Sequence, residues 1–398
     1  MRIGIFTDQY YPAVSGVVTS IETLEAGLRN LGHDVYIITS IDLTRLKENE
    51  IEEYNRKSKY ILNIPGKHYP LKKLKGYRFC KIKNEYINDV KKLNLDIIHV
   101  QTEFSISKLA IKCSKVLNIP MIHTFHTLFD DYLSYVSGLF NKIFPNMMHN
   151  ILVNRFLKPV SKQSLIEIVP TKKVYDKRNH YKLGINNDIR IIPTGINLDS
   201  FLNSQRDEML INKYHLVGRF VYLFVGRLSE EKSIKNLIDA YKAVASDDNA
   251  LLIVGDGPQA NELKKYTNEL KLENNIIFTG FIKWDEISKY YALGDLFLCD
   301  SKSETQGLTY LEALASGLPL LVRSDSCLND LLKENVNGIS YNNIDELISK
   351  MKFLKNNDKL LKSLKENARI STKNYTDKIF VKRILDVYED VLKINSQN

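Results

Sequence analysis

Residues 304–307, Glu-Thr-Gln-Gly, place a carboxylate, a hydroxyl, an amide and a glycine between two contrasting sequence patterns. The apolar run Leu296–Cys299 before them is typical of a buried parallel strand. The apolar spacing after them predicts a helix that begins at Leu308 and is ended by Gly317. In open α/β sheets such strand-to-helix junctions bind anionic ligands, because the free amides and the dipole of the helix start favour negative charge.

Two glutamates belong to this junction. Glu304 precedes the predicted helix, whereas Glu312 lies about two turns inside it. A carboxylate ahead of a phosphate-binding turn suits the hydroxyl groups of a sugar better than the phosphates themselves, so we expect Glu304 to contact a sugar. The alternative is that Glu304 caps the helix and Glu312 faces solvent, and the spacing alone does not separate the two interpretations.

Two cations mark a second junction of the same kind. Residues 220–226 form an apolar run, Arg227 and Lys232 follow it, and a helical pattern begins at Ser233. Two fixed positive charges at one turn can bind a single anion. They would offset the charge that builds up on a diphosphate leaving group as its bond breaks. The alternative is a pair of solvated surface side chains.

The first half of the chain begins with a strand–loop–helix–strand pattern over residues 2–39, which predicts a Rossmann-like βαβ unit. The loop lacks a GxGxxG motif, which counts against a dinucleotide site. Gly16 would let the backbone approach a ligand phosphate at the helix start, unless it is a plain turn glycine. His126 lies at the polar end of another predicted strand, 121–127, and is either a hydrogen-bond donor to a ligand or a structural histidine.

Length and strand pattern predict two domains, because a chain of 398 residues exceeds the size at which a single core keeps growing. Short strands at 169–171 and 191–195 close the first half. Residues 220–323 hold a second set of apolar strands whose loops, including the glycine turn at Gly255, gather at one edge. The predicted fold class is α/β with two Rossmann-like domains. The predicted parts are residues 1–195, residues 196–376, and a C-terminal helix within 377–398 that returns to the first domain.

Basic residues are concentrated in the first half. Residues 1–195 carry 29 Lys+Arg and 18 Asp+Glu, a net charge of +11, whereas the whole chain carries +9. This asymmetry indicates a polyanionic partner or an anionic surface. Residues 56–83 mix basic and aromatic side chains, and residues 138–162 place an apolar stripe opposite a basic face. Both segments suit a membrane interface, and the first also suits single-stranded nucleic acid. The alternatives are a solvated loop and a helix packed on its own domain.

Several classes of protein are disfavoured. The opening residues turn polar too soon for a signal peptide, and no run approaches the ~18 apolar residues of a membrane-spanning helix. The four cysteines match no CxxC pattern, which fits a reduced cytosolic protein without disulfides or a structural metal. No Asp-x-Asp pair occurs, so a sugar-nucleotide site built on a divalent ion is poorly supported. No RNP-like or helix-turn-helix signature supports nucleic-acid binding.

The combination of Val-Gly-Arg at 225–227 with Lys232, the glycine turn at 254–258 and the Glu304–Glu312 pair resembles the retaining family 4 glycosyltransferases of the GT-B fold. The resemblance covers nearly the whole chain. Residues 15–20 and 304–310 are most similar to the bacterial diacylglycerol glucosyltransferases of this family, which are monotopic enzymes that use UDP-glucose. The basic first half and residues 138–162 agree with that subgroup.

The resemblance implies a role for each matching residue. Gly16 would approach the donor diphosphate, and Arg227 and Lys232 would clamp it and act in catalysis. Glu304 would bind the hydroxyls of the donor sugar, His126 would contact the transferred sugar near the acceptor, and both would also act in catalysis. The remaining donor contacts would come from Gly255, Thr305, Gln306, Gly307 and Leu308, from Glu312 at the ribose, and from the backbone around Ile282 at the base. Many relatives have Glu-x-Phe-Gly at 304–307, so positions 305 and 306 depart from the family pattern.

The resemblance also implies a reaction. Glucose would move from UDP-glucose to the 3-hydroxyl of 1,2-diacylglycerol with retention of the anomeric configuration, and no motif requires a metal or a covalently bound cofactor. The partners would be anionic membrane lipids, the diacylglycerol acceptor and the UDP-sugar donor, and not nucleic acid. The enzyme would act peripherally at the cytoplasmic face of the cell membrane. The alternatives are another lipid-linked or soluble glycan acceptor, or a nucleic-acid-binding protein.

Overall fold

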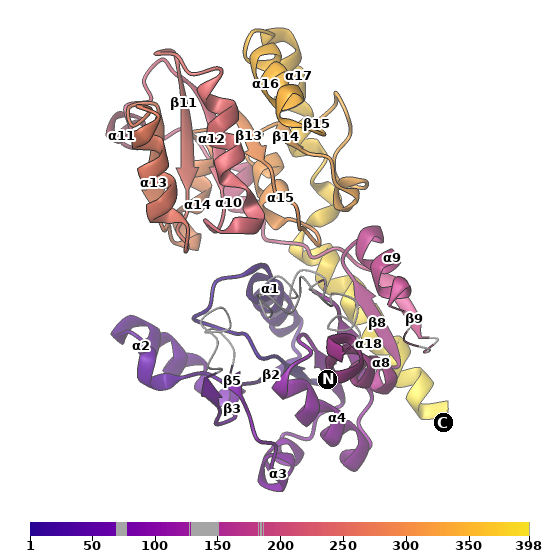
Figure 1. The fold of residues 1–398 in the computed structure, drawn as a ribbon. Coiled ribbons are helices and arrows are strands. Elements are labelled where there is room, and N and C mark those ends of the chain that lie inside the picture. The colour runs from indigo at the N-terminus through magenta and orange to yellow at the C-terminus, as the bar shows by residue number, and fades with distance from the viewer. Residues whose placement is uncertain are drawn as a thin grey trace. The chain divides into compact units, whose positions relative to one another are not determined.

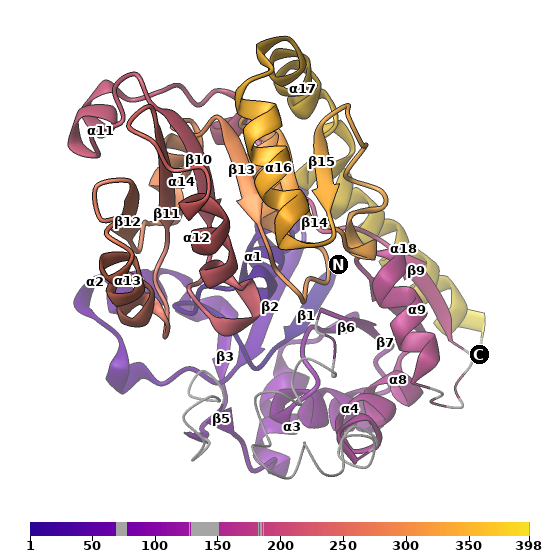
Figure 2. The ribbon, with the colours of Figure 1, turned by 45° about the horizontal axis from the view of Figure 1, so that its top comes forward.

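The computed structural model describes residues 1–68, 78–126, 128, 151–181, 183, 185 and 187–397. The chain divides into two compact units, and each is described by itself. The first unit combines Met1–Ile196 with the C-terminal segment Asp377–Asn398, and the second unit is Asn197–Thr376. Figures 1 and 2 show the elements of both units, coloured along the chain.

The first unit is built on a parallel sheet with the strand order β3-β2-β1-β6-β7-β8-β9. The strands are β1 (Arg2–Phe6), β2 (Asp34–Thr39), β3 (Ile61–Asn63), β6 (Ile97–Val100), β7 (Met121–Thr124), β8 (Ile166–Val169) and β9 (Asp188–Ile191). A short antiparallel pair consists of β4 (Lys67–His68) and β5 (Arg78–Phe79). The helices described here are α1 (Gly16–Asn30), α2 (Glu48–Lys57), α3 (Asn84–Lys92), α4 (Ser105–Leu117), α8 (Lys158–Gln163), α9 (Lys172–His180) and α18 (Asp377–Gln397).

Alternating side chains of the first sheet feed two cores, because successive residues of a strand point to opposite faces. Ile3 and Ile5 of β1 belong to the core under α1 and α18, whereas Phe6 belongs to the core under α3 and α4. Parallel strands need crossover helices, so both faces of such a sheet are covered and both are apolar.

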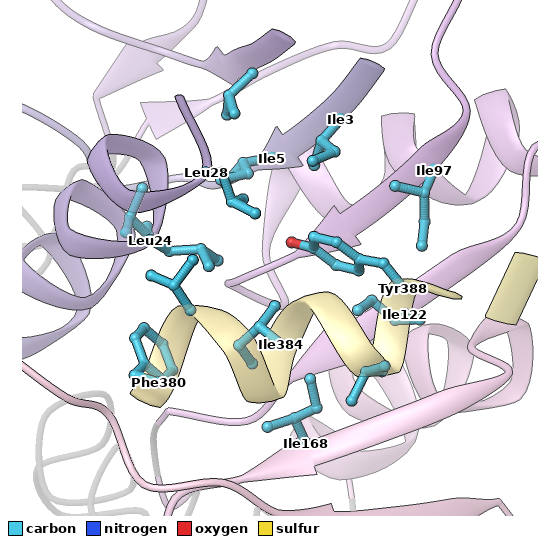
Figure 3. Close-up of a cluster of buried hydrophobic side chains, with 14 of the residues drawn as sticks. Ile3, Ile5, Leu24, Leu28, Ile97, Ile122, Ile168, Phe380, Ile384 and Tyr388 are labelled. Carbon is cyan, nitrogen blue, oxygen red and sulfur yellow. The ribbon is translucent and has the colours of Figure 1, made fainter. Parts of the chain in front are cut away.

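The C-terminal helix α18 completes the first of these cores. Its side chains Phe380, Ile384 and Tyr388 are buried against residues of α1, β1, β6, β7 and β8, as Figure 3 shows. The two helices approach closely, because a Cβ atom on Gly27 of α1 would lie 2.3 Å from a methyl carbon of Val381. The predicted return of the C-terminal helix to the first domain is therefore confirmed.

The second unit has a parallel sheet with the order β12-β11-β10-β13-β14-β15. The strands are β10 (Phe220–Val225), β11 (Asn249–Val254), β12 (Ile276–Gly280), β13 (Leu296–Cys299), β14 (Leu320–Arg323) and β15 (Gly338–Tyr341). The helices are α10 (Asp199–Leu202), α11 (Glu208–Lys213), α12 (Ile234–Lys242), α13 (Ala260–Glu269), α14 (Trp284–Tyr291), α15 (Leu308–Ala315), α16 (Ile344–Lys355) and α17 (Asp358–Ile370). Figure 2 shows β10, β13 and β14 side by side. The strand order reverses direction between β10 and β13, which is the place where doubly wound sheets bind ligands.

The predicted fold class, α/β with two Rossmann-like units, is confirmed, but two strand positions are wrong. The strands predicted at 169–171 and 191–195 are displaced. β8 already ends at residue 169 and β9 at residue 191, where the predicted strands begin. Pro170 and Pro193 have no N–H group to give to a ladder, which excludes them from the middle of a sheet. The real β8 contains the buried charged residue Glu167, which hides the apolar pattern of the strand.

Candidate functional site

Lys232 and Glu304 meet at the reversal point of the second sheet. Lys232 ends a short 3-10 turn, Glu230–Lys232, in the loop after β10, and Glu304 lies in the loop after β13. Because β10 and β13 are adjacent and parallel, their carboxyl-end loops emerge next to each other. The ammonium group of Lys232 donates a hydrogen bond to the carboxylate of Glu304. The two side chains are only 21% and 11% exposed, so the pair is mostly shielded from water.

The electrostatics of this pair keep Lys232 charged. Burial by itself lowers the pKa of a lysine, because it penalises the ammonium form. At Lys232 this effect is outweighed by the nearby Glu304 carboxylate, and the pKa of Lys232 rises above its ordinary value. A positive charge is therefore fixed at the end of β10 throughout the physiological pH range.

Hydrogen bonds brace the two loops against each other. The amide of Lys302 donates to the carbonyl of Glu231 at 3.1 Å. The side-chain amide of Asn236, in the first turn of α12, donates to Asp300 at 2.7 Å, and the hydroxyl of Tyr341 donates to the other oxygen of Asp300 at 2.9 Å. These hydrogen bonds hold the loops that carry Lys232 and Glu304 in a fixed arrangement.

Glycine backbones bring the loops after β10 and β11 into contact. Gly255 has φ +134°, and a Cβ atom on it would lie 2.0 Å from the carbonyl oxygen of Gly226. The amide of Leu228 then donates to the carbonyl of Asp256 at 3.0 Å. Arg227 lies in this joined loop with an exposed side chain. The structure thus places both predicted cations after β10 and shows a packing reason for Gly255.

The loop before α15 does not follow the helix-cap alternative. The N-cap of α15 is Gly307, with φ +74°, and this residue has no side chain that could accept a hydrogen bond. Glu304 is therefore not the cap, and Glu312 is not on a solvated face, because it is only 4% exposed. Gln306 is buried, whereas Thr305 and Leu308 are half-buried around the same turn.

Glu312 has a partner that the sequence did not indicate. The hydroxyl of Tyr291, on α14, donates to the carboxyl of Glu312 at 2.6 Å. Burial raises the pKa of Glu312 to about 7, and the Tyr291 hydrogen bond only partly offsets it. The half-buried Ile282 precedes α14, so the predicted base contact and the Tyr291–Glu312 pair are attached to one segment.

The two predicted residues of the first unit lie at carboxyl ends of its strands. Gly16 is the first residue of α1, and the side chain of Ser15 caps this helix by accepting from the amide of Val18 at 3.3 Å. His126 follows β7 and is half-buried, with its Nε2 atom 2.6 Å from Oε1 of Gln101. The hydrogen on Nε2 is thus given to the protein and not to a ligand.

Among the described residues, neither of two cavities and no metal-binding group coincides with the predicted site. A cavity of about 240 Å³ in the first unit is lined by Asp8, Tyr11, Asp42 and Arg78 among others, and one of about 550 Å³ in the second unit by residues of 213–278. None of the predicted site residues lines either cavity. Within the described ranges no group of three or more His, Cys, Asp or Glu could hold a metal ion.

The predicted membrane segments fall partly outside the described residues. These gaps include 69–77 within the basic region 56–83, and 138–150 within the amphipathic segment 138–162. The described end of the latter runs through a π-helical turn, Val153–Leu157, into α8, and Val153 and Leu157 are buried in the first unit. In the part of the chain that the structure covers, no helix has both the length and the apolar character needed to span a bilayer.

Family models match both halves of the chain. The one described as Glycosyltransferase Family 4 matches residues 14–200, and the one described as Glycosyl transferases group 1 matches residues 207–371. The alpha-monoglucosyldiacylglycerol synthase of Acholeplasma laidlawii is 37% identical over 404 residues, which cover 100% of this chain and 99% of that protein. The enzyme of the same name from Streptococcus pneumoniae is 38% identical over 350 residues, covering 86% of this chain and 75% of that protein.

Solved structures share the fold. The structure of HepE from Anabaena in complex with UDP-glucose has a TM-score of 0.75 at 18% identity and covers 98% of this chain and 100% of that one. The sucrose-phosphate synthase of Thermosynechococcus elongatus has a TM-score of 0.76 at 17% identity, with 99% of each chain covered. With a relative 37% identical along its full length, the chain belongs to the family 4 glycosyltransferases, and its fold is GT-B.

Proposed function

We propose that this glycosyltransferase moves glucose from UDP-glucose to the 3-hydroxyl of 1,2-diacylglycerol, with retention of the anomeric configuration. The observation that carries the proposal is the end-to-end similarity, at 37% identity, to a relative named alpha-monoglucosyldiacylglycerol synthase. A second relative with that name supports the same acceptor. The HepE structure, whose title names UDP-glucose, supports the donor class through a shared fold.

The Lys232–Glu304 pair suits the two ends of a sugar diphosphate. An ammonium group has three hydrogens, and Glu304 takes one of those of Lys232, which leaves the others for phosphate oxygens. The carboxylate of Glu304 has acceptor capacity for sugar hydroxyls beside the same cation. In our proposal Arg227 adds a second positive charge to the diphosphate, and Gly16 approaches it from the first unit.

The remaining predicted residues complete the donor site in this proposal. The backbone of the 304–308 turn, with Thr305, Gln306, Gly307 and Leu308, lies along sugar and phosphate. Gly255 keeps the loops joined, Glu312 holds the ribose, and the backbone around Ile282 meets the base. His126 contacts the transferred sugar from the acceptor side.

We propose same-face substitution for the chemical step. The bond between the anomeric carbon and the β-phosphate oxygen breaks, the 3-hydroxyl oxygen of the acceptor bonds to the same face of that carbon, and its proton passes to the departing phosphate. UDP and monoglucosyldiacylglycerol are the products. Lys232 and Arg227 stabilise the charge that develops on the leaving diphosphate, which is the interaction that lowers the barrier.

The test is a transfer assay with radiolabelled sugar nucleotides. The full-length protein is incubated with diacylglycerol in anionic micelles and either UDP-glucose or UDP-galactose, and labelled lipid is separated from free sugar. We expect glucose to be transferred and the α-linkage to appear in the NMR spectrum of the product. Label found only on a soluble or another lipid-linked glycan acceptor, or only as free sugar, would contradict the diacylglycerol proposal.

We also propose peripheral attachment to anionic membrane at the cytoplasmic face, through the basic first half. Lys67 of β4 is exposed, as are Lys81 and Lys83, which follow β5 in the chain, and Phe79 of β5 is 49% exposed. Each such cation near anionic headgroups contributes about 1 kcal/mol, so three of them correspond to about a 100-fold change in binding.

A matched pair of triple variants tests this attachment by vesicle flotation. Changing Lys67, Lys81 and Lys83 to serine is expected to weaken binding to anionic vesicles about 100-fold. The same change at three exposed lysines of the second unit, 264, 265 and 352, removes equal charge and is expected to change binding much less. Equal binding to neutral and anionic vesicles, or equal loss in both variants, would contradict a located electrostatic attachment.

A further inference from the structure

A chain of hydrogen bonds connects the C-terminal helix to His126. Tyr388 of α18 contacts Nδ1 of His99 at 2.7 Å, and Nε2 of His99 lies 3.0 Å from Nε2 of Gln101. Oε1 of Gln101 lies 2.6 Å from Nε2 of His126. The hydroxyl of Thr124 also contacts Nε2 of His99, at 2.6 Å. Tyr388, His99 and Gln101 are almost wholly buried, and Figure 3 shows Tyr388 reaching from α18 into the core.

The orientation of the Gln101 amide gives this chain one direction. The amide nitrogen of Gln101 can only donate, so Nε2 of His99 accepts from it, and the hydroxyl of Thr124 lies beside the same nitrogen. The hydrogen of His99 is therefore on Nδ1, and it is donated to the hydroxyl oxygen of Tyr388. The amide oxygen of Gln101 can only accept, so Nε2 of His126 must carry a hydrogen.

Burial and a charged neighbour keep His126 neutral. Burial and the adjacent His123 lower the pKa of His126 to about 3. His123 itself is charged: burial lowers its pKa, but the hydrogen bond to Glu103 and the Glu167 carboxylate 3.6 Å from its Nδ1 atom outweigh this and raise the pKa to about 9. Glu167 is in turn paired with Arg178. A neutral imidazole with its hydrogen on Nε2 has its lone pair on Nδ1, and no described residue forms a hydrogen bond to Nδ1 of His126.

We propose that Gln101 is a positioning residue that holds His126 as a hydrogen-bond acceptor, with Nδ1 presented to a hydroxyl of the transferred sugar, and that the Tyr388 hydroxyl supports this arrangement by accepting from Nδ1 of His99. The role in transfer rests on the function proposed above, whereas the state of His126 does not. The sequence predicted His126 as a donor, and the contacts with Gln101 reverse that role.

Loss of the Tyr388 hydroxyl is expected to reverse the whole chain. Without it, the hydrogen on Nδ1 of His99 is buried and unpaired, which is unfavourable. His99 escapes this cost by carrying its hydrogen on Nε2 and donating to Gln101, whose amide then turns its NH₂ group toward His126. Nε2 of His126 becomes an acceptor, and its hydrogen moves to Nδ1.

NMR spectroscopy of the full-length protein with ¹⁵N-labelled histidine measures this state directly, because long-range correlations distinguish protonated from unprotonated ring nitrogens. His126→Gln identifies the His126 signals. In the wild type we expect hydrogen on Nε2 of His126 and no titration of the ring between pH 5 and 9. In Tyr388→Phe we expect hydrogen on Nδ1. In Gln101→Glu the new carboxylate is expected to raise the pKa of His126 by about 2.

Tyr222→Phe is the matched control. Its hydroxyl is also buried and donates one hydrogen bond, to the carbonyl of Met351 at 3.1 Å, but it lies in the second unit. This variant is expected to keep the wild-type spectrum of His126. Hydrogen on Nδ1 in the wild type, or an unchanged His126 in both Tyr388→Phe and Gln101→Glu, would overturn the proposal. If either of those two variants does not fold, the other one still decides it.

Kinetics test the role in transfer. Gln101→Leu is expected to lower kcat of glucosyl transfer by about 10-fold or more, with the KM for UDP-glucose changed less than about 2-fold, because it misplaces one group at the transferred sugar and leaves the proposed contacts to the diphosphate and the base unchanged. Unchanged kcat would overturn the role of Gln101 in transfer. Failure of the wild type to glucosylate diacylglycerol would instead overturn the proposed function, and the NMR result would stand.

Discussion

Replacing Lys232 by methionine removes one partner of the ion pair and leaves the Glu304 carboxylate mostly buried without its ammonium group. Breaking a fully buried pair costs about 3–5 kcal/mol, whereas exposed pairs contribute about 0–1 kcal/mol. The side chains of Lys232 and Glu304 are 21% and 11% exposed, which lies between these limits but nearer to the buried one. We expect Lys232→Met to lower the free energy of unfolding by about 2 kcal/mol.

A double-mutant cycle isolates the pair. Unfolding of the wild type, Lys232→Met, Glu304→Gln and the double variant is followed without substrate. A loss of about 2 kcal/mol corresponds to about 6 °C in the midpoint of a unit of this size. The double variant has no unpaired charge, so we expect it to be more stable than Lys232→Met alone. Lys242→Met, an exposed lysine at the end of α12, is the control and should change stability by less than about 0.5 kcal/mol.

Activity is expected to follow a different order from stability. Each of the three variants lacks a group that we assign to the sugar diphosphate, so all three should lose about 10²-fold or more in kcat, including the double variant that regains stability.

The pH dependence of stability provides a separate check. Because the pKa of Lys232 in the folded state is raised, the stabilisation is present below the ordinary lysine pKa of 10.5 and is lost only above it. The stability difference between Lys232→Met and wild type should therefore stay constant from pH 7 to 9.

Two outcomes would refute this reasoning. Additive effects on stability, with no coupling between Lys232 and Glu304, would show that the pair contributes nothing to the fold. Full activity of the double variant would show that Lys232 and Glu304 interact only with each other and not with the donor. The assignment of the donor diphosphate to this pair would then be wrong.

Three further predictions concern Arg227, Gly255 and Glu312. Arg227→Ala should lower kcat about 10²-fold without changing stability by more than about 0.5 kcal/mol, because its side chain is exposed; unchanged turnover would exclude it from the reaction. Gly255→Ala should destabilise by at least about 2 kcal/mol in denaturant unfolding, whereas Gly32→Ala, with φ +83° but no atom within 4 Å, should cost about 1 kcal/mol; equal losses would exclude the backbone clash. Burial raises the pKa of Glu312 from 4.5 to about 7, so its contribution to stability is present below pH 4.5 and is lost as pH rises to 7. Relative to wild type, Glu312→Gln should therefore gain about 3 kcal/mol between pH 4.5 and 8, and a constant difference would contradict the shift.

The Lys232–Glu304 pair could be predicted because it depends on topology more than on detail. Lys232 and Glu304 are 72 residues apart, but each follows an apolar strand, and the two strands become neighbours in a doubly wound sheet. Burial drives those strands together, and the pattern of buried strands is visible in the sequence. The return of α18 was visible in the same way, through an apolar face that needed a partner.

Contacts between buried polar groups could not be predicted in this way. β8 was misplaced because Glu167 interrupts its apolar run, and the charge is acceptable only because His123 and Arg178 meet it inside the first unit. Tyr388 and His99 are 289 residues apart, and the sequence around either residue does not predict the other as its hydrogen-bond partner. Such partners are fixed by the requirement that every buried donor finds an acceptor, which depends on the finished packing.

The return of α18 makes the second unit an insertion within the first. The chain leaves the first unit after Ile196 and re-enters it at Asp377, and these two points touch, since the amide of Asp377 donates to the carbonyl of Ile196 at 3.0 Å. During synthesis the first unit must wait for the last turns of the chain before Leu24, Leu28 and their neighbours are covered, while the second unit can close as soon as residue 376 has emerged from the ribosome. A chain that stops at 376 thus leaves the apolar side chains that α18 would cover exposed, and exposed apolar surface of this kind is prone to aggregation and is bound by chaperones.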